Sequence, residues 1–218
     1  REGQALVLDA GTFRYNGAPE FENRLKYAAL HNGVVIDGRE PVTDAGKFLW
    51  LDWASARILE NYASSVSAEV LAFRKFGAKA VRRLSRTDFG WRVADDLDFT
   101  PGALRIAQLN WLVPDGELDI LLDGRNILIQ RAGYKIRLTV EGSAVMAAGL
   151  IVIRNGQIIR TLGNPARIEP ERVRWMGVIS PTYAEIHPAI SFVYSVSGTG
   201  TMRIITDWIF ESTGATIS

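Results

Sequence analysis

Apolar and polar residues alternate along several stretches of this chain. The clearest is YKIRLTVE at 134–141, where Tyr134, Ile136, Leu138 and Val140 would share one face. A period of two over five to eight residues is typical of a half-buried β-strand. The same alternation recurs in three further segments, at residues 104–113, 191–198 and 201–210. The pattern therefore predicts mainly β-structure.

Turn signals separate these apolar stretches. Asn155-Gly156 lies between two of them and predicts a tight hairpin, because both residues tolerate a positive φ. Pro114-Asp115-Gly116 is a second turn candidate and Asp123-Gly124 is a third.

Helical periodicity is weak. The best helix candidate is 55–66, but a β interpretation that continues through residues 67–76 fits at least as well. Strands spaced almost regularly from residue 4 to 210 predict an all-β fold, a large supersandwich-like antiparallel β-sandwich with little helix. We expect a single β-sandwich domain over 1–218, as the C-terminal part of a longer enzyme.

Composition narrows the function classes. The 218 residues are 47% hydrophobic and 22% charged, as in ordinary soluble globular proteins. With 25 Lys and Arg against 24 Asp and Glu, the net charge of +1 gives no signature of nucleic-acid or membrane binding. The absence of cysteine excludes disulfides, thiolate metal sites and thiol nucleophiles. We expect the six tryptophans mostly to fill the core between the sheets.

No self-sufficient catalytic motif is present, since there is no Gly-rich phosphate loop, no G-x-S-x-G and no H-E-x-x-H. The first residues have neither an initiator methionine nor a signal-peptide pattern, and they run almost directly into a strand-like segment. We therefore expect this chain to be a piece of a longer protein.

The segment YAALHNGVVIDGRE, at 27–40, carries one of only two histidines. His31 precedes a strand-like run that ends at Asp37-Gly38. One interpretation is a half-buried imidazole bonded to a backbone group, with Asp9 capping a turn through its own backbone. The other is that Asp9 and His31 meet across neighbouring strands as oxygen and nitrogen ligands of a divalent metal, for which zinc is suited. Two ligands do not complete a zinc site.

The second histidine, His187, precedes Pro188, which favours an extended backbone before the next strand. We expect an exposed or hydrogen-bonded loop histidine there.

Three irregular motifs occur in order near the start: LVLDAGTFRYNG at 6–17, NRLKYAALHNGVVIDGREP at 23–41 and GKFLW at 46–50. Together they resemble the C-terminal β-sandwich of the heparinase II/III-like polysaccharide lyases. That family typically has Asp-Ser-Gly-Thr-Tyr, then Arg-Ser-Thr-Ala-Ala-His-Asn-Thr, then an apolar strand and Asp-Gly. WRVADDLD at 91–98 and GVISPTYAEIHPAISFVY at 177–194 are also similar to later family segments.

The resemblance implies a parent enzyme that cleaves a uronate-containing, acidic polysaccharide by β-elimination, in which an N-terminal α/α toroid precedes this β-sandwich. It places Asp9 and His31 on the positions of two zinc ligands. The third ligand and a catalytic histidine belong to a His-x-His-like stretch before Arg1, and the catalytic tyrosine belongs to the toroid. We therefore expect no catalytic residue in this chain beyond a minor role for His31, and no activity from it alone. The substrate type implies a periplasmic or secreted bacterial parent.

The chain departs from the family pattern at Lys26-Tyr27-Ala28, which replaces Arg-Ser-Thr, and lysine lacks the bidentate fork of arginine. Arg24 and Lys26 could bind an acidic sugar, although both could equally be solvated surface charges. Tyr15 and Asn16 could line the same cleft. The alternative function is a non-catalytic carbohydrate-binding or structural β-sandwich domain, in which His31 is structural.

Overall fold

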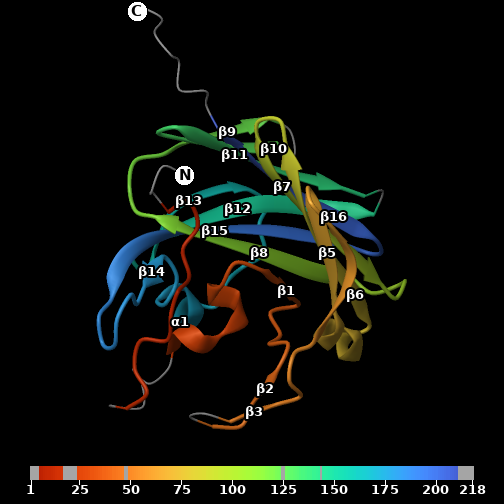
Figure 1. Cartoon of the computed structure of the whole chain (residues 1–218), viewed down its shortest axis with the longest axis horizontal. Helices are drawn as coiled ribbons and strands as arrows, with labels where there is room; N and C mark the ends of the chain where they lie inside the picture. Colours follow the sequence, from red (N-terminus) through yellow and green to blue (C-terminus); the bar gives the residue numbers. More distant parts are fainter. Residues whose placement is uncertain (1–4, 17–23, 47–48, 124–125, 143, 211–218) are drawn as a thin grey trace, which may run out of the picture. The chain divides into compact units, whose positions relative to one another are not determined.

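The computed structural model describes residues 5–16, 24–46, 49–123, 126–142 and 144–210. β-strands dominate it, and the predicted all-β class of antiparallel sheets with little helix is confirmed (Figure 1). The chain divides into two compact units. Unit 1 comprises residues 1–54, 103–116 and 146–199, and unit 2 comprises 55–102, 117–145 and 200–218. No helix in the described ranges is long and apolar enough to cross a membrane.

Unit 1 is built on a sheet with the strand order β1-β8-β15-β12-β13, and β14 pairs with β15 outside this path. A small β2-β3 ladder lies apart from this sheet. The strands are β1 (Val34–Ile36), β2 (Thr43–Asp44), β3 (Trp50–Leu51), β8 (Arg105–Pro114), β12 (Val145–Arg154), β13 (Gln157–Gly163), β14 (Val178–Ile179) and β15 (His187–Gly198). The helical segments are the 3₁₀ helices η1 (Arg24–Lys26) and η2 (Ala28–Leu30) and the short α1 (Pro170–Val173).

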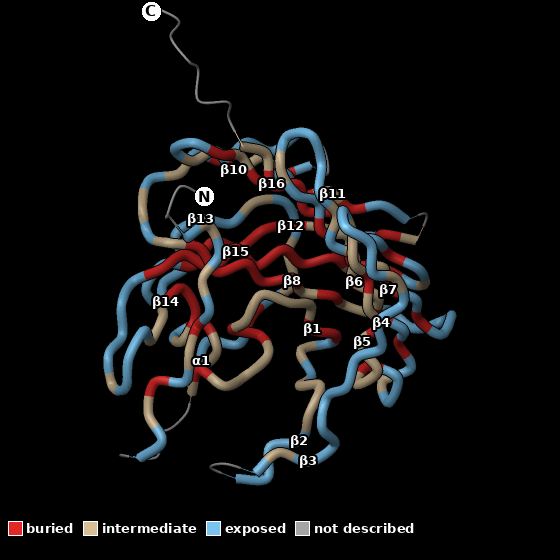
Figure 2. The backbone as a smooth tube through the Cα atoms, in the orientation of Figure 1, coloured by how far each residue is buried: buried red, intermediate tan, exposed pale blue. Residues whose placement is uncertain are grey.

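The central strands of unit 1 are buried more completely than alternation predicts. Residues 109–113 of β8 and 189–196 of β15 are buried without interruption, so both faces of these strands are enclosed. Figure 2 shows the buried stretches along β8, β12 and β15. Asn110, a polar residue of β8, is also buried: its Nδ2 donates to the His31 carbonyl at 3.4 Å, while its Oδ1 has no hydrogen-bond partner among the described residues.

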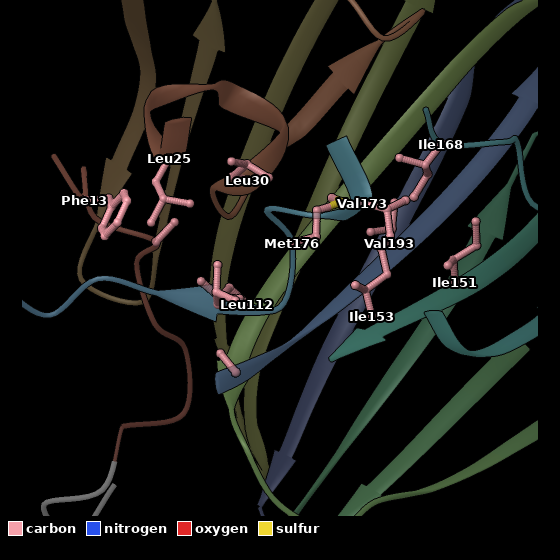
Figure 3. Packing of buried hydrophobic residues seen from close by; sticks show 13 residues of the cluster. Phe13, Leu25, Leu30, Leu112, Ile151, Ile153, Ile168, Val173, Met176 and Val193 are labelled. Carbon is pink, nitrogen blue, oxygen red and sulfur yellow. The ribbon is translucent and has the colours of Figure 1, made fainter. Parts of the chain in front are cut away.

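A hydrophobic cluster joins the N-terminal segments of unit 1 to its sheet. Phe13, Leu25 and Leu30 lie in one buried cluster with Leu112 of β8 and Val193 of β15 (Figure 3). Burying a side chain of this size contributes about 1.5–3 kcal/mol. This packing therefore fixes the segment after Asp9 and the 3₁₀ helix before His31 against the same strands.

Unit 2 is built on a sheet with the order β4-β5-β6-β7-β16-β11-β10-β9. Its elements are β4 (Ala56–Tyr62), β5 (Ser65–Val70), the 3₁₀ helix η3 (Leu71–Phe76), β6 (Ala78–Thr87), β7 (Gly90–Phe99), β9 (Asp119–Asp123), β10 (Asn126–Arg131), β11 (Tyr134–Glu141) and β16 (Met202–Phe210). The β interpretation of 55–70 is thus confirmed, while 71–76 forms a 3₁₀ helix. On β11, the four residues predicted to share a face are all buried.

Two of the turn predictions lie in hairpins. Asn155 and Gly156 have φ of 48° and 73° and join the antiparallel strands β12 and β13, as expected for a type I′ turn. β9 and β10 also pair antiparallel, although residues 124–125 of their turn lie outside the described residues. The turn at 114–116 is different, because β8 and β9 belong to different sheets and it therefore closes no hairpin.

The expectation that tryptophans mostly fill the core is only partly correct. Trp111 and Trp208 are buried, but Trp53 is 80% exposed and Trp91 is 42% exposed. An apolar count alone does not distinguish tryptophans that fill the core from those at the surface.

Candidate functional site

Asp9 and His31 meet in unit 1, although they are 22 positions apart in sequence. The Asp9 Oδ2 and His31 Nδ1 atoms are 2.8 Å apart. The Asp9 side chain is 69% exposed and that of His31 is 33% exposed, so the pair opens to solvent. The predicted meeting of these two side chains is therefore observed.

The strand expected after His31 forms as β1, but the expectation that Asp9 and His31 meet across neighbouring strands is wrong. Residues 5–10 form no strand, and His31 follows the 3₁₀ helix η2 as its C-cap residue. The physical reason is the side chain of Asn32. Leu8 N–H donates to the Leu112 carbonyl at 2.8 Å, but the Asn32 amide occupies the reciprocal position. It donates to the Leu8 carbonyl at 2.6 Å and accepts from Leu112 N–H at 2.8 Å.

Asn32 thus links the segment that carries Asp9 to β8, and it is adjacent to His31 in sequence. Its amide satisfies two backbone groups that a regular β-ladder would have paired with each other. Asn32 therefore couples the position of Asp9 to that of His31.

Asp9 also caps a turn, as the alternative interpretation predicted. Its Oδ1 accepts a hydrogen bond from Gly11 N–H at 2.8 Å. Gly11 has a φ of +74°, and a Cβ there would lie 2.4 Å from the Ser180 carbonyl oxygen. Partial burial raises the pKa of Asp9, but hydrogen bonds from His31 and Gly11 outweigh it and leave the pKa below its ordinary value. Asp9 is therefore a carboxylate at neutral pH.

Glu40 supports the His31 loop from the other side, and sequence reasoning missed it. Its Oε2 accepts a hydrogen bond from Ala28 N–H at 2.8 Å, at the start of η2. Its Oε1 is buried and has no hydrogen-bond partner in the described part of the chain. Burial raises the pKa of Glu40 above its ordinary value, although the hydrogen bond from Ala28 opposes that rise. The only sequence signal was its place just after the Asp37-Gly38 turn.

Lys26 lies in a pocket of charge and aromatic rings rather than in open solvent. Its Nζ is 2.7 Å from Asp44 Oδ2 and 4.7 Å from the ring centroid of Trp50, and its side chain is 10% exposed. Tyr27 donates a hydrogen bond to the same Asp44 carboxylate at 3.2 Å. The charge of Lys26 is thus neutralised within unit 1.

The other predicted substrate residues lie in two places. Arg24 begins η1 and is half-buried, while Tyr15 and Asn16 are exposed. The Tyr15 hydroxyl is 3.4 Å from Thr12 Oγ1. The Tyr15 ring lies 6.2 Å from that of Tyr183, which the sequence reasoning did not single out.

His187 is exposed and hydrogen-bonded as predicted, but it lies in a strand rather than in a loop. It is the first residue of β15, its side chain is 55% exposed, and its Nε2 lies 3.4 Å from Glu185 Oε2.

The donor chemistry of Asp9 and His31 fits a zinc ion. An imidazole nitrogen and a carboxylate oxygen are typical zinc ligands. Here they point at one another across 2.8 Å, and the carboxylate is open to solvent. Within the described ranges, no group of three or more His, Cys, Asp or Glu side chains could hold a metal. The pair therefore offers one nitrogen and one oxygen donor, which are fewer than a zinc ion needs.

Comparisons with known proteins show which family and which solved structures this chain resembles. The model of the family "Heparinase II/III-like, C-terminal" matches residues 1–215. A solved heparinase III, the BT4657 gene product, has a TM-score of 0.63 and 15% identity over 98% of this chain. The heparan sulfate lyase HepC from Pedobacter heparinus has a TM-score of 0.62 and 12% identity over 97% of it. The chain spans only 29% and 30% of the length of those two proteins. No curated protein matches it.

Proposed function

Because this chain belongs to the heparinase II/III-like C-terminal family, we propose that it is the β-sandwich part of a polysaccharide lyase that cleaves a uronate-containing polysaccharide by β-elimination. The observation that carries the proposal is the Asp9–His31 pair, exposed and in direct contact, at the two positions where the resemblance implies metal ligands. The similar solved structures support the fold that this role requires.

Asp9 and His31 would hold a divalent metal, preferably zinc, with further ligands from residues that precede Arg1 in the parent enzyme. A bound zinc supplies a fixed positive charge beside an acidic substrate. Asn32 and Glu40 hold the two ligand-bearing segments through the backbone groups of Leu8, Leu112 and Ala28. This support keeps the ligand atoms in place, as outer partners do in metal sites generally.

The proposed reaction breaks the bond between C4 and its glycosidic oxygen. A base removes the C5 proton, the electrons of that C–H bond form the C4–C5 double bond, and the departing oxygen receives a proton from a general acid. Negative charge develops next to the uronate carboxylate and needs nearby cations or hydrogen-bond donors. We propose that the base and the acid lie outside this chain, which binds and orients the acidic polysaccharide.

Among the residues of this chain, Tyr15, Asn16 and Arg24 are proposed to contact the sugar. Lys26 is assigned an indirect role, because its ammonium group already pairs with Asp44. It would hold Asp44 and the neighbouring Tyr27 in position. A periplasmic or secreted bacterial location is proposed from the substrate type alone.

The proposal is tested by incubating the full-length protein with a panel of uronate polysaccharides, including alginate, glycosaminoglycans and bacterial exopolysaccharides. We expect ultraviolet absorbance from the new C4–C5 double bond to rise with at least one of them. Binding of a polysaccharide without any unsaturated product across the panel would reject the lyase and favour the non-catalytic carbohydrate-binding alternative.

A further inference from the structure

Two exposed tyrosines from distant parts of the chain lie side by side in unit 1. The Tyr15 and Tyr183 ring centroids are 6.2 Å apart, with an angle of 32° between the ring planes. Tyr15 is 42% exposed and Tyr183 is 57% exposed. Each ring therefore keeps a substantial area in contact with solvent.

The segments that carry these rings are fixed to one another by their backbones. Ser180 N–H donates to the Ala10 carbonyl, and Ala184 N–H donates to the Phe13 carbonyl, both at 2.9 Å. The contact at Gly11 is close enough that only glycine avoids a clash with Ser180. The two tyrosines thus project from one rigid junction rather than from independent loops.

This junction has a strained backbone next to both rings. Phe13 and Ala184 have φ of +69° and +66°, a region that side chains other than glycine rarely adopt. The Phe13 ring is buried and lies 6.1 Å from the ring of Trp175, which compensates for its backbone conformation. Strain held in this way is concentrated at functional sites in proteins.

A cation lies on the same junction. The Arg14 guanidinium is 5.0 Å from the ring centroid of Phe13, and its Nε is buried with no hydrogen-bond acceptor in the described ranges. None of the acidic side chains described in the structure forms an ion pair with it. Arg14 thus precedes Tyr15 in sequence and is a cation stacked on the Phe13 ring of the same junction.

We propose that Tyr15, Tyr183 and Arg14 form a binding subsite for an acidic pyranose of the polysaccharide. The ring faces contact the apolar C–H face of the sugar, and the guanidinium pairs with its carboxylate. This inference rests on the proposed function and adds Tyr183 and Arg14 to it. The tyrosine hydroxyls suit a hydrated, polyhydroxylated ligand better than an apolar protein surface.

The test measures the Kd of the full-length protein for uronate oligosaccharides and for the same oligosaccharides with reduced carboxyl groups. We expect Tyr183→Ala to raise both Kd values about three- to tenfold, and Tyr183→Phe, which keeps the ring and loses only the hydroxyl, to raise them less. Arg14→Met keeps the packing on Phe13, so it is expected to weaken only the binding of the acidic form. Tyr62→Ala is the matched control, because Tyr62 is a 67% exposed tyrosine on β4 of unit 2.

An unchanged Kd in Tyr183→Ala, with the melting temperature preserved, overturns the subsite. The outcome is separate from that of the proposed function, because binding is measured without turnover. If the wild type forms unsaturated products and the Tyr183→Ala variant binds the oligosaccharides as tightly as the wild type, the lyase proposal stands and the subsite is rejected. If the wild type forms no unsaturated products but Tyr183→Ala raises the Kd for the oligosaccharides, the lyase proposal is rejected and the subsite stands.

Discussion

At the scale of single residues, Asn32 explains how an irregular N-terminal segment reaches the His31 loop. Its amide bonds Leu8 and Leu112, the two residues that would otherwise pair fully. The sequence pointed to His31, whose side chain contacts Asp9. The side-chain amide of the neighbouring Asn32 holds the segment that carries Asp9 next to β8.

We predict that Asn32→Ala lowers the free energy of unfolding by about 1–3 kcal/mol, because it leaves the Leu8 carbonyl and the Leu112 N–H without their partner. Thermal unfolding of the purified protein measures this loss. Asn61→Ala is the control, since Asn61 is exposed on β4, and it should change the melting temperature little. Equal melting temperatures for the two variants would contradict the role of Asn32.

At the scale of elements, the strands were predictable where one face is buried and the other is not. β11 alternates in sequence and in burial, so its boundaries and its inner face followed from the pattern. The Asn155-Gly156 hairpin followed from local turn chemistry alone. These features depend on neighbours in sequence, which a single chain displays.

Features that depend on distant partners were not predictable. Residues 5–10 are apolar enough for a strand, but the Asn32 side chain occupies a backbone hydrogen bond that a β-ladder through them would need. Glu40 and Tyr183 gain their roles only when the fold brings them to η2 and to Tyr15. The meeting of Asp9 and His31 was one of two interpretations that the residues allowed, and the family resemblance supported it.

A second feature at this scale is an ion-pair cluster of Glu69, Arg57 and Arg74 near the β4 edge of the unit 2 sheet. Glu69 of β5 is fully buried and accepts hydrogen bonds from Arg74 of η3 and Arg57 of β4, both at 2.8 Å. The hydrogen bond from Arg74 is the main cause that lowers the pKa of Glu69, with burial opposing it and Arg57 adding to it. The Glu69 carboxylate is protonated more readily in the unfolded chain than in the folded protein. Its contribution to the free energy of unfolding is therefore fully present above the unfolded pKa of about 4.3 and is lost as the pH falls through the lower folded pKa.

We therefore predict that Glu69→Gln lowers the melting temperature at neutral pH and reduces its dependence on pH in the acid range. Melting curves of the wild type and the variant from neutral to strongly acidic pH measure this. Parallel acid limbs in the two proteins would show that Glu69 does not provide the acid sensitivity.

At the scale of the whole molecule, charge is arranged more specifically than the net value of +1 indicates. In unit 2, arginines pair with carboxylates across neighbouring strands, as in Arg82–Asp95 and Arg92–Asp207. In unit 1, the Arg14 guanidinium lies over the Phe13 ring, and no acidic side chain of the described residues pairs with it. The net charge does not reveal such local differences.

The most direct test of the proposed Asp9–His31 metal site is the zinc content of the full-length protein. We predict stoichiometric zinc in the wild type, loss of that zinc in Asp9→Ala and in His31→Ala, and its retention in His187→Ala. The last variant is the control, because the His187 side chain is exposed and contacts Glu185 rather than Asp9 or His31. Zinc that is absent from the wild type, or that remains stoichiometric in His31→Ala, would contradict the assignment of Asp9 and His31 as metal ligands.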